Sequence, residues 1–146
     1  MAVLVIAVGL PASGKSTYFA KLGVQAISTD SIRLQLADDA GDQTVHGAVF
    51  ATVRFLIRQR IAIHRPVTYV DATSLTRKDR KFLLQIARHY GCRAEALFFD
   101  TPLEVCLERN RNRQRIVPED VIRMMAAKLK PPTTEEGFAL VTVIKP

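Results

Sequence analysis

Eight residues near the amino terminus have the types and the spacing that hold a triphosphate. The segment Gly9-Leu10-Pro11-Ala12-Ser13-Gly14-Lys15-Ser16 matches G-x-x-x-x-G-K-[ST] at every fixed position. In such a loop the backbone N–H groups face the phosphates, the lysine reaches the β and γ oxygens, and the serine hydroxyl binds Mg²⁺. The sequence therefore predicts ATP and Mg²⁺ as cofactors, with Lys15 also catalytic. The predicted nucleotide-binding residues of this loop are Gly9, Ala12, Ser13, Gly14, Lys15, Ser16 and Thr17.

A carboxylate, Asp71, follows the apolar run at residues 67–70. In P-loop proteins an acid at the end of a neighbouring strand holds Mg²⁺, usually through water. The alternative is a carboxylate that only caps the loop that follows it. We favour the metal interpretation because of the P-loop, and we predict Ser16 and Asp71 as the metal residues.

Asp30 and Arg33 stand three residues apart at the start of a predicted helix, so one face of that helix carries both side chains. Asp30 is the predicted general base, which would accept the proton of an attacking hydroxyl. Arg33 is predicted to clamp an anion on the acceptor. The alternative for Asp30 is a helix N-cap, a common position for aspartate.

The segment 109–115 carries arginine at alternate positions, and Arg109 and Arg113 share one face of a predicted helix. Phosphoryl-transfer enzymes place such arginines on a lid, where they neutralise charge on the transferred group. A solvated basic face is the alternative. Beside a P-loop we favour the lid, and we predict that Arg109 and Arg113 bind nucleotide and act in catalysis.

Strands and helices alternate along the whole sequence. The predicted strands span residues 3–8, 24–28, 67–70, 93–99 and 140–144. The predicted helices span residues 17–22, 30–36, 44–63, 76–90, 102–112 and 118–130. This order predicts a three-layer α/β fold of the P-loop kinase type, with a five-stranded, mainly parallel sheet and helices on both faces. We expect a single domain over residues 1–146, with a small arginine-bearing lid near 109–130, and the site at the carboxyl ends of the strands.

Composition narrows the class of protein further. The net charge is +7, which attracts polyanions, although many basic proteins bind none. Cys92 and Cys106 have no zinc-ligand spacing. Residues 1–9 are predicted to be a strand and not a signal peptide, no run is long enough to span a bilayer, and we expect a cytoplasmic protein. The aromatic residues Phe50, Phe55 and Phe82 fit the core faces of helices better than a platform for stacking bases.

Several stretches together resemble the polynucleotide 5′-hydroxyl kinase family. The resemblance is closest to the kinase module of a bacterial RNA-repair enzyme that joins kinase, phosphatase and ligase modules. It covers nearly the whole chain, and the D-Q-T-V element and the lid sequence are its more specific parts. The stretches that carry it are the P-loop at 9–17, S-T-D-S-I-R at 28–33, D-Q-T-V-H-G-A-V-F at 42–50, V-D-A-T at 70–73 and V-C-L-E-R-N-R-N-R at 105–113.

The resemblance implies transfer of the ATP γ-phosphoryl to the 5′-OH end of RNA or DNA, in nucleic acid repair. Asp30 would be the base for the 5′-OH, and Arg33 would hold the next phosphate of the strand. Separate phosphatase or ligase proteins would be candidate partners. The chain departs from the family at Ala12, where glycine is common, and alanine is expected to be tolerated there if φ is negative.

Two other functions compete with this one. A small-molecule kinase, acting on a sugar, a nucleoside or an antibiotic, would share the P-loop and the base but would need a closed acceptor pocket in place of an open basic groove. A nucleotide-dependent switch or a nucleic-acid-binding NTPase would transfer nothing to a hydroxyl. The net charge favours the polynucleotide kinase, and the pair Asp30 and Arg33 favours either kinase over the switch.

Overall fold

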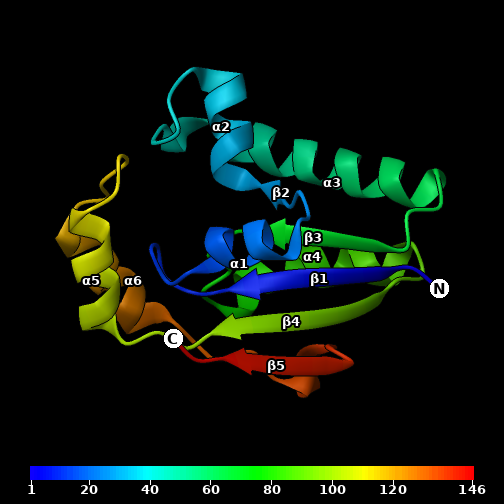
Figure 1. Ribbon diagram of the computed structural model, residues 1–146. Coiled ribbons are helices and arrows are strands. Elements are labelled where there is room, and N and C mark those ends of the chain that lie inside the picture. Colours follow the sequence, from blue (N-terminus) through cyan, green and yellow to red (C-terminus); the bar gives the residue numbers. More distant parts are fainter.

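A computed structural model describes residues 1–146, and its five strands form a single parallel sheet in the order β2-β3-β1-β4-β5. All of the strand pairings are parallel, so the predicted sheet is confirmed and is parallel throughout. The strand arrows point to the same end of the molecule (Figure 1). The strands are β1 (Val3–Val8), β2 (Ile27–Ser28), β3 (Val67–Asp71), β4 (Arg93–Phe99) and β5 (Leu140–Ile144).

The helices connect successive strands, as the alternation in the sequence predicts. Most predicted bounds agree to within two residues, but the second predicted strand, 24–28, is reduced to β2, which pairs with β3 through two residues only. The helices are α1 (Lys15–Leu22), α2 (Thr29–Ala37), α3 (His46–Ala62), α4 (Arg77–His89), α5 (Leu103–Arg111) and α6 (Glu119–Lys128), with short 3-10 turns η1 (Gln43–Val45) and η2 (Thr134–Glu136).

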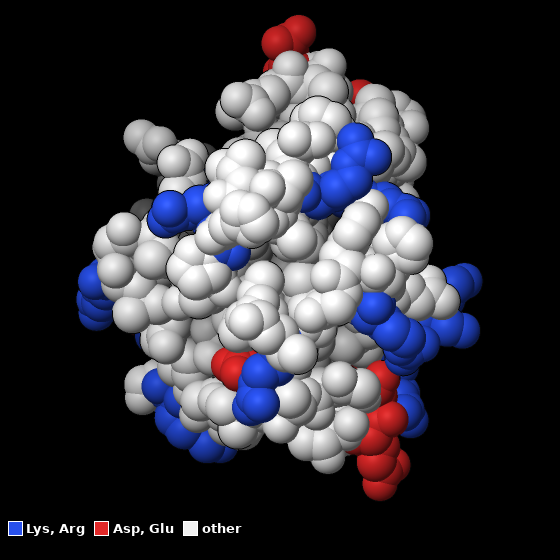
Figure 2. All heavy atoms as spheres, turned by 90° about the vertical axis from the view of Figure 1, so that its right-hand side faces the viewer, with Lys and Arg blue, Asp and Glu red and all other residues white.

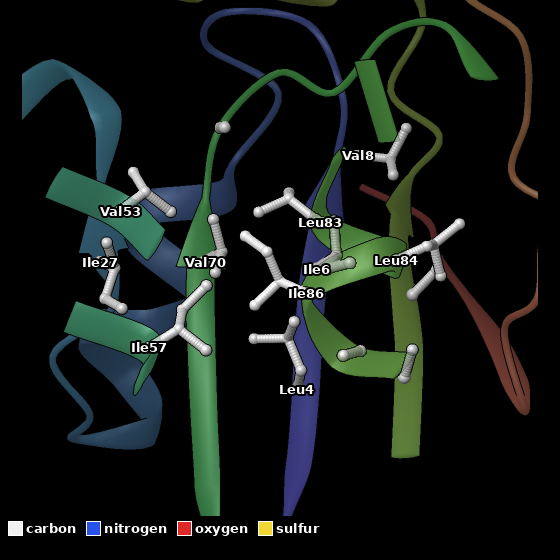
Figure 3. Packing of buried hydrophobic residues seen from close by; sticks show 14 of the residues in the cluster. Leu4, Ile6, Val8, Ile27, Val53, Ile57, Val70, Leu83, Leu84 and Ile86 are labelled. Atoms are coloured by element: carbon white, nitrogen blue, oxygen red, sulfur yellow. The ribbon is translucent and has the colours of Figure 1, made fainter. Parts of the chain in front are cut away.

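Alternate residues of β1 bury opposite faces of the sheet, because successive side chains of a strand point to opposite sides. Leu4, Ile6 and Val8 pack into the main core with α3 and α4, as Figure 3 shows for Val53, Ile57, Leu83 and Ile86. On the other face Ala7 packs with Phe19 of α1 and Phe99 of β4. Helices therefore cover both faces, which confirms the three-layer P-loop kinase-like fold.

The expectation that three phenylalanines belong to core faces holds for two of them. Phe50 of α3 and Phe82 of α4 are half-buried and pack against the main core. Phe55 is 52% exposed, so the expectation is wrong for this residue. It lies on the outer side of α3, where Arg58 stands 5.5 Å above its ring.

A fully buried ion pair ties the loop after β3 to the chain that leads into β5. Arg80 of α4 is 0% exposed and binds Glu136 through two hydrogen bonds of 2.8 and 3.0 Å. The same guanidinium also donates to the backbone carbonyls of Ser74, Leu75 and Lys130. Because the loop at 72–76 follows Asp71 directly, this anchor holds one wall of the strand-end site in position.

None of the helices has both the length and the apolar composition that crossing a membrane would require. Figure 2 views the end of the molecule away from the strand tips, where lysine and arginine side chains are scattered among uncharged surface.

Candidate active site

The P-loop joins β1 to α1, and two glycines set its path. Gly14 has φ 105° and precedes α1 without a side-chain cap, so the first N–H groups of the helix remain open to an anion. Gly9 leaves no room for a side chain, because a Cβ there would stand 2.7 Å from Ser13 Oγ and 3.1 Å from Phe99 Cβ. Both glycines are therefore required by geometry as well as by the motif.

Ala12 adopts φ 63°, in the left-handed region. The condition under which alanine was expected to be tolerated, a negative φ, is therefore not met, and an L-residue here costs about 1–2 kcal/mol. Contacts from both neighbouring strand ends hold the loop in this path. Gly9 N donates to Thr73 O at 3.0 Å, and Thr101 Oγ1 donates to Ser13 O at 2.8 Å. Thr101 belongs to no motif, so no pattern in the sequence indicates this anchor.

Lys15 lies folded back onto the P-loop and is almost fully buried. Its Nζ donates to the carbonyls of Gly9 at 2.9 Å and Leu10 at 2.7 Å. Burial lowers the pKa of Lys15 to about 8, although the carboxylates of Asp71 and Asp30 act in the opposite direction. A triphosphate in the loop would supply the anionic partner that this buried ammonium lacks.

Ser16 and Asp71, the predicted metal residues, are in direct contact. Ser16 Oγ donates to Asp71 Oδ2 at 2.8 Å, across 55 residues of sequence. Hydroxyl and carboxylate oxygens suit Mg²⁺, which usually takes one or two protein carboxylates together with substrate phosphates and waters. No group of three or more His, Cys, Asp or Glu side chains gathers to hold a metal. The residues present therefore fit a Mg²⁺ that is bound jointly with the nucleotide.

Asp30 is not the cap of its helix. The side chain of Ser28 accepts the N–H of Ser31 at 3.2 Å, so Ser28 caps α2 and the capping alternative for Asp30 is excluded. The carboxylate of Asp30 is 58% exposed and lines the same cleft as Lys15. Arg33 Nη1 lies 3.4 Å from Asp30 Oδ1, which is the spacing on one helix face that the sequence predicts.

Two guanidinium groups at this site have a buried nitrogen without a partner. Arg33 is 6% exposed, and its Nε makes no hydrogen bond. Arg113 Nη2 is also unpaired, and the pKa of Arg113 is lowered by burial and then by the neighbouring charge of Arg115. Buried polar groups are normally satisfied, so these nitrogens are the groups that a bound anion would pair with.

The lid segment, residues 109–130, lies at the carboxyl ends of the strands (Figure 1). Its Arg109 reaches the P-loop, because Nη1 stands 3.6 Å from the position of a Cβ on Gly14. Lys15, Arg109 and Arg113 therefore surround the place where the motif predicts the phosphates. This arrangement can neutralise charge on a transferred phosphoryl group.

Sequence reasoning missed Arg115 as a site residue. Its Nη1 donates to Asp30 Oδ2 at 3.0 Å, and its Nη2 donates to Ala40 O at 3.3 Å. Arg115 follows the end of α5, where helical periodicity no longer predicts where a side chain points. The alternation of arginines was the only available signal.

Asn110 closes the loop of the lid segment and was also missed. It is fully buried, donates to Val117 O at 2.7 Å and accepts from Val117 N at 3.0 Å, as a strand partner would. Its Oδ1 also accepts from Nε of Arg113 at 3.2 Å. Asn110 thus orients Arg113, although nothing in the motif distinguishes it from its neighbours.

All predicted site residues except Gly9 line a single cleft of about 2000 Å³ at the strand tips. The P-loop and the lid segment form two walls of this cleft. The remaining walls come from α2, α3 and the start of α4. The structure therefore brings the predicted residues together, while the individual roles remain predictions.

A protein family described as an AAA domain, AAA_33, matches residues 4–132. The chain belongs to this family. The curated relatives include the L-seryl-tRNA(Sec) kinase of Homo sapiens, 32% identical over 94 residues, which covers 64% of this chain and 27% of that protein. The enzyme of the same name from Methanococcus maripaludis is 26% identical and covers 94% of this chain and 56% of that protein. The chain thus spans about a quarter to just over half of the length of these relatives.

Among solved structures, a sugar kinase from Janibacter sp. HTCC2649 has a TM-score of 0.71 at 17% identity, covering 99% of this chain and 86% of that one. At this identity the likeness concerns the fold alone. The family match and the curated relatives, which are kinases, agree with the coarser part of the sequence prediction, a nucleotide-binding phosphotransferase.

The finer part of that prediction is wrong. The curated relatives are L-seryl-tRNA(Sec) kinases and not polynucleotide 5′-hydroxyl kinases. The predictions of the 5′-OH end of RNA or DNA as acceptor, of a repair role, and of phosphatase or ligase partners are therefore wrong. The physical reason for the error is that a P-loop followed by an aspartate and arginine pair is shared by kinases that act on many hydroxyls, so these residues do not specify the molecule that carries the hydroxyl.

Proposed function

We propose that this chain is an ATP-dependent kinase that transfers the γ-phosphoryl group to the hydroxyl of a small organic group. The observation that carries the proposal is the position of Asp30. Its side chain does not cap the helix and lines the same cleft as Lys15 and the Ser16–Asp71 pair. A proton acceptor beside a phosphate site is the arrangement that transfer to a hydroxyl needs.

Each residue has a defined task in this reaction. Asp30 accepts the proton of the acceptor hydroxyl, whose oxygen forms the new bond to phosphorus as the bond from phosphorus to the ADP oxygen breaks. Lys15, Arg109 and Arg113 bind phosphate oxygens and neutralise their charge. Ser16 and Asp71 would hold Mg²⁺, which would supply charge neutralisation on the phosphates.

Arg33 would select the acceptor. Its guanidinium is buried one helical turn from the base, and its Nε has no partner. A small acceptor with an anionic or carbonyl oxygen near its hydroxyl would satisfy this nitrogen. Acceptors that lack such an oxygen would leave it buried and unpaired, at a cost in binding.

The curated relatives favour one acceptor in particular, the seryl hydroxyl of an aminoacyl-tRNA, since they are L-seryl-tRNA(Sec) kinases. The seryl group is small and carries a carbonyl close to its hydroxyl. The net charge of +7 is compatible with an RNA carrier. In this second candidate the small hydroxyl-bearing group is attached to a tRNA, and the proposed reaction is otherwise the same.

The experiment incubates the protein with Mg²⁺, γ-labelled ATP and a set of acceptors: seryl-tRNA, free serine, a sugar acid and a nucleoside. Label on at least one acceptor is expected, and label on seryl-tRNA alone would select the second candidate. The proposal fails if label is released only as inorganic phosphate at a rate that no acceptor changes, because a switch or an NTPase behaves in this way.

A pair of aspartate variants on α2 sharpens this test. Asp30→Asn removes the proposed base and should reduce transfer by about 10²–10⁴-fold. Asp38→Asn is the matched control, because Asp38 ends the same helix with φ 58°, outside the cleft lining, and asparagine tolerates that conformation. Equal effects of the two substitutions on transfer would remove Asp30 as the base.

A further inference from the structure

The cleft continues past the catalytic residues, between the start of α3 and the start of α4. Its volume of about 2000 Å³ is roughly twice that of the larger pockets that hold a single small ligand, about 300–1000 Å³. A second hollow of about 190 Å³ shares Arg54 and Phe82 with the cleft and extends it along the same two helices. The cleft therefore has more room than a triphosphate and a small hydroxyl group fill.

Aromatic rings line this extension. His46 and Phe50 lie one turn apart on α3, with ring centroids 4.5 Å apart and planes tilted by 39°. The ring of Phe82, from α4, meets Phe50 edge to face at 5.7 Å. His46 is exposed, and the two phenylalanines are half-buried, with part of each ring against the core and part lining the cleft. Such a surface stacks a planar ring.

Cations flank the rings. Arg54 follows Phe50 by four residues on α3, and Lys78 precedes Phe82 by four residues on α4, so each cation shares a helix face with a ring. Both side chains are exposed, and neither makes an ion pair or a hydrogen bond within the protein. The nearby acid, Asp79, accepts the N–H of Thr76 in the capping box of α4. Arg54 and Lys78 outnumber this carboxylate, so the net charge beside the rings is positive.

We infer that His46, Phe50, Arg54, Lys78 and Phe82 form a ring subsite that binds a planar heterocycle carrying a phosphate, as part of the acceptor. This inference rests on the proposed kinase function and specifies its acceptor class. The shared chemistry is that of a nucleotide, which could be a free nucleoside monophosphate or the terminal nucleotide of an RNA that carries the small hydroxyl group. The rings would stack the base, and Arg54 and Lys78 would pair with the phosphate.

The test measures stacking directly. Protein saturated with a non-hydrolysable ATP analogue and Mg²⁺ is titrated with 2-aminopurine riboside, with its 5′-monophosphate, and with a short single-stranded RNA that ends in 2-aminopurine at its 3′ end. Quenching of the base fluorescence is expected, stronger with the phosphate than without it and weaker at high salt. Tighter binding of the monophosphate identifies a free nucleotide as the source, and tighter binding of the RNA identifies an RNA end.

Substitutions test which residues cause the fluorescence quenching. Phe50→Leu with Phe82→Leu should weaken binding by about tenfold or more, because leucine keeps most of the volume but cannot stack. Arg54→Gln with Lys78→Gln, at exposed positions that do not endanger folding, should remove the preference for the phosphate. Phe55→Leu and Arg58→Gln are matched controls on α3, because neither residue lines the cleft, and they should leave the quenching unchanged.

No quenching by the wild-type protein with any of the three probes would overturn the ring subsite, as would quenching that survives both double substitutions. The quenching assay requires no transfer of phosphate. A failed transfer assay beside a positive quenching result would therefore overturn the proposed kinase function alone, and the reverse result would overturn the subsite alone.

Discussion

Arg115, in the loop between α5 and α6, donates from Nη1 to Oδ2 of Asp30 at 3.0 Å, although 85 residues separate them in sequence. This contact joins the lid segment to α2 across the cleft. It also occupies one oxygen of the proposed base. An acceptor hydroxyl that approaches Asp30 therefore competes with Arg115 for the carboxylate.

We predict that Arg115→Gln lowers the KM for the acceptor by up to about fivefold and changes the free energy of unfolding by less than about 1 kcal/mol. Both limits follow from the exposure of the pair, 43% for Arg115 and 58% for Asp30, since exposed ion pairs contribute about 0.2–1 kcal/mol. Steady-state kinetics and urea unfolding measure the two quantities. A tenfold loss of kcat with no change in KM would instead make Arg115 part of the transition-state machinery.

Arg113→Gln should lower kcat by about 10²–10³-fold, because a cation that neutralises charge on the transferred group contributes most in the transition state. The control is Arg111→Gln in the same segment. Arg111 makes a two-pronged ion pair with Glu119 at 2.6 and 3.1 Å and does not line the cleft, so kcat should stay within about twofold. Similar losses in both variants would indicate a general effect of positive charge.

The affinity for ATP should fall as the pH rises above about 8, the pKa of Lys15 in the free protein. The triphosphate favours the charged ammonium, so binding takes up a proton wherever the free protein has lost it. The expected fall is about tenfold per pH unit above that value, until the pKa of the complex is reached. Calorimetry in buffers with different ionisation enthalpies measures the proton uptake directly. A constant affinity between pH 7.5 and pH 9.5 would contradict this account of Lys15.

Arg80→Met should destabilise the protein by about 3–5 kcal/mol, since it leaves Glu136, only 3% exposed, as a buried and unpaired charge. Adding Glu136→Gln should recover at least about 1 kcal/mol, because it removes that charge. Urea unfolding of the single and double variants measures both effects. A double variant less stable than Arg80→Met would mean that the cost lies in the lost backbone contacts of Arg80 and not in the unpaired carboxylate.

Ala12→Gly should raise the free energy of unfolding by about 0.5–1 kcal/mol. Glycine removes the left-handed penalty of about 1–2 kcal/mol at φ 63°, and its greater freedom in the unfolded chain takes back about 0.4–1 kcal/mol. Ala20→Gly is a control of opposite sign, since Ala20 is exposed within α1 and should lose about 1 kcal/mol there. Thermal or urea unfolding distinguishes the two directions.

The sequence predicts best the strands whose bounds follow from their own residues. β1, β4 and β5 have the predicted bounds, because each is rich in apolar residues and ends at a change to polar or turn residues. β2 is much shorter than predicted, since a strand at the sheet edge ends where its only neighbour, β3, stops pairing with it. Strand pairing depends on the rest of the chain, so the pattern of residues 24–28 alone does not predict how many of them pair.

The candidate site divides in the same way. Lys15, Ser16 and Asp71 could be predicted because a fixed loop and a fixed strand order bring them together. Thr101 and Asn110 could not, because each acts through a contact that forms only once the loop and the lid segment have folded. The acceptor was predicted wrongly because the residues predicted near the transferred group are common to kinases of different acceptors. We propose that the rest of the acceptor is recognised elsewhere in the cleft.

The P-loop wall and the α2 wall of the cleft are anchored to the sheet in different ways. The P-loop is bonded at Gly9 and Ser13 to the loops after β3 and β4, the strands on either side of β1. The opposite wall, α2, follows a strand with two paired residues and packs on α3. Changes in α2 and α3 would therefore disturb few contacts of the phosphate cradle. A lineage could exchange one acceptor for another by altering these two helices, while the machinery for using ATP stays as it is.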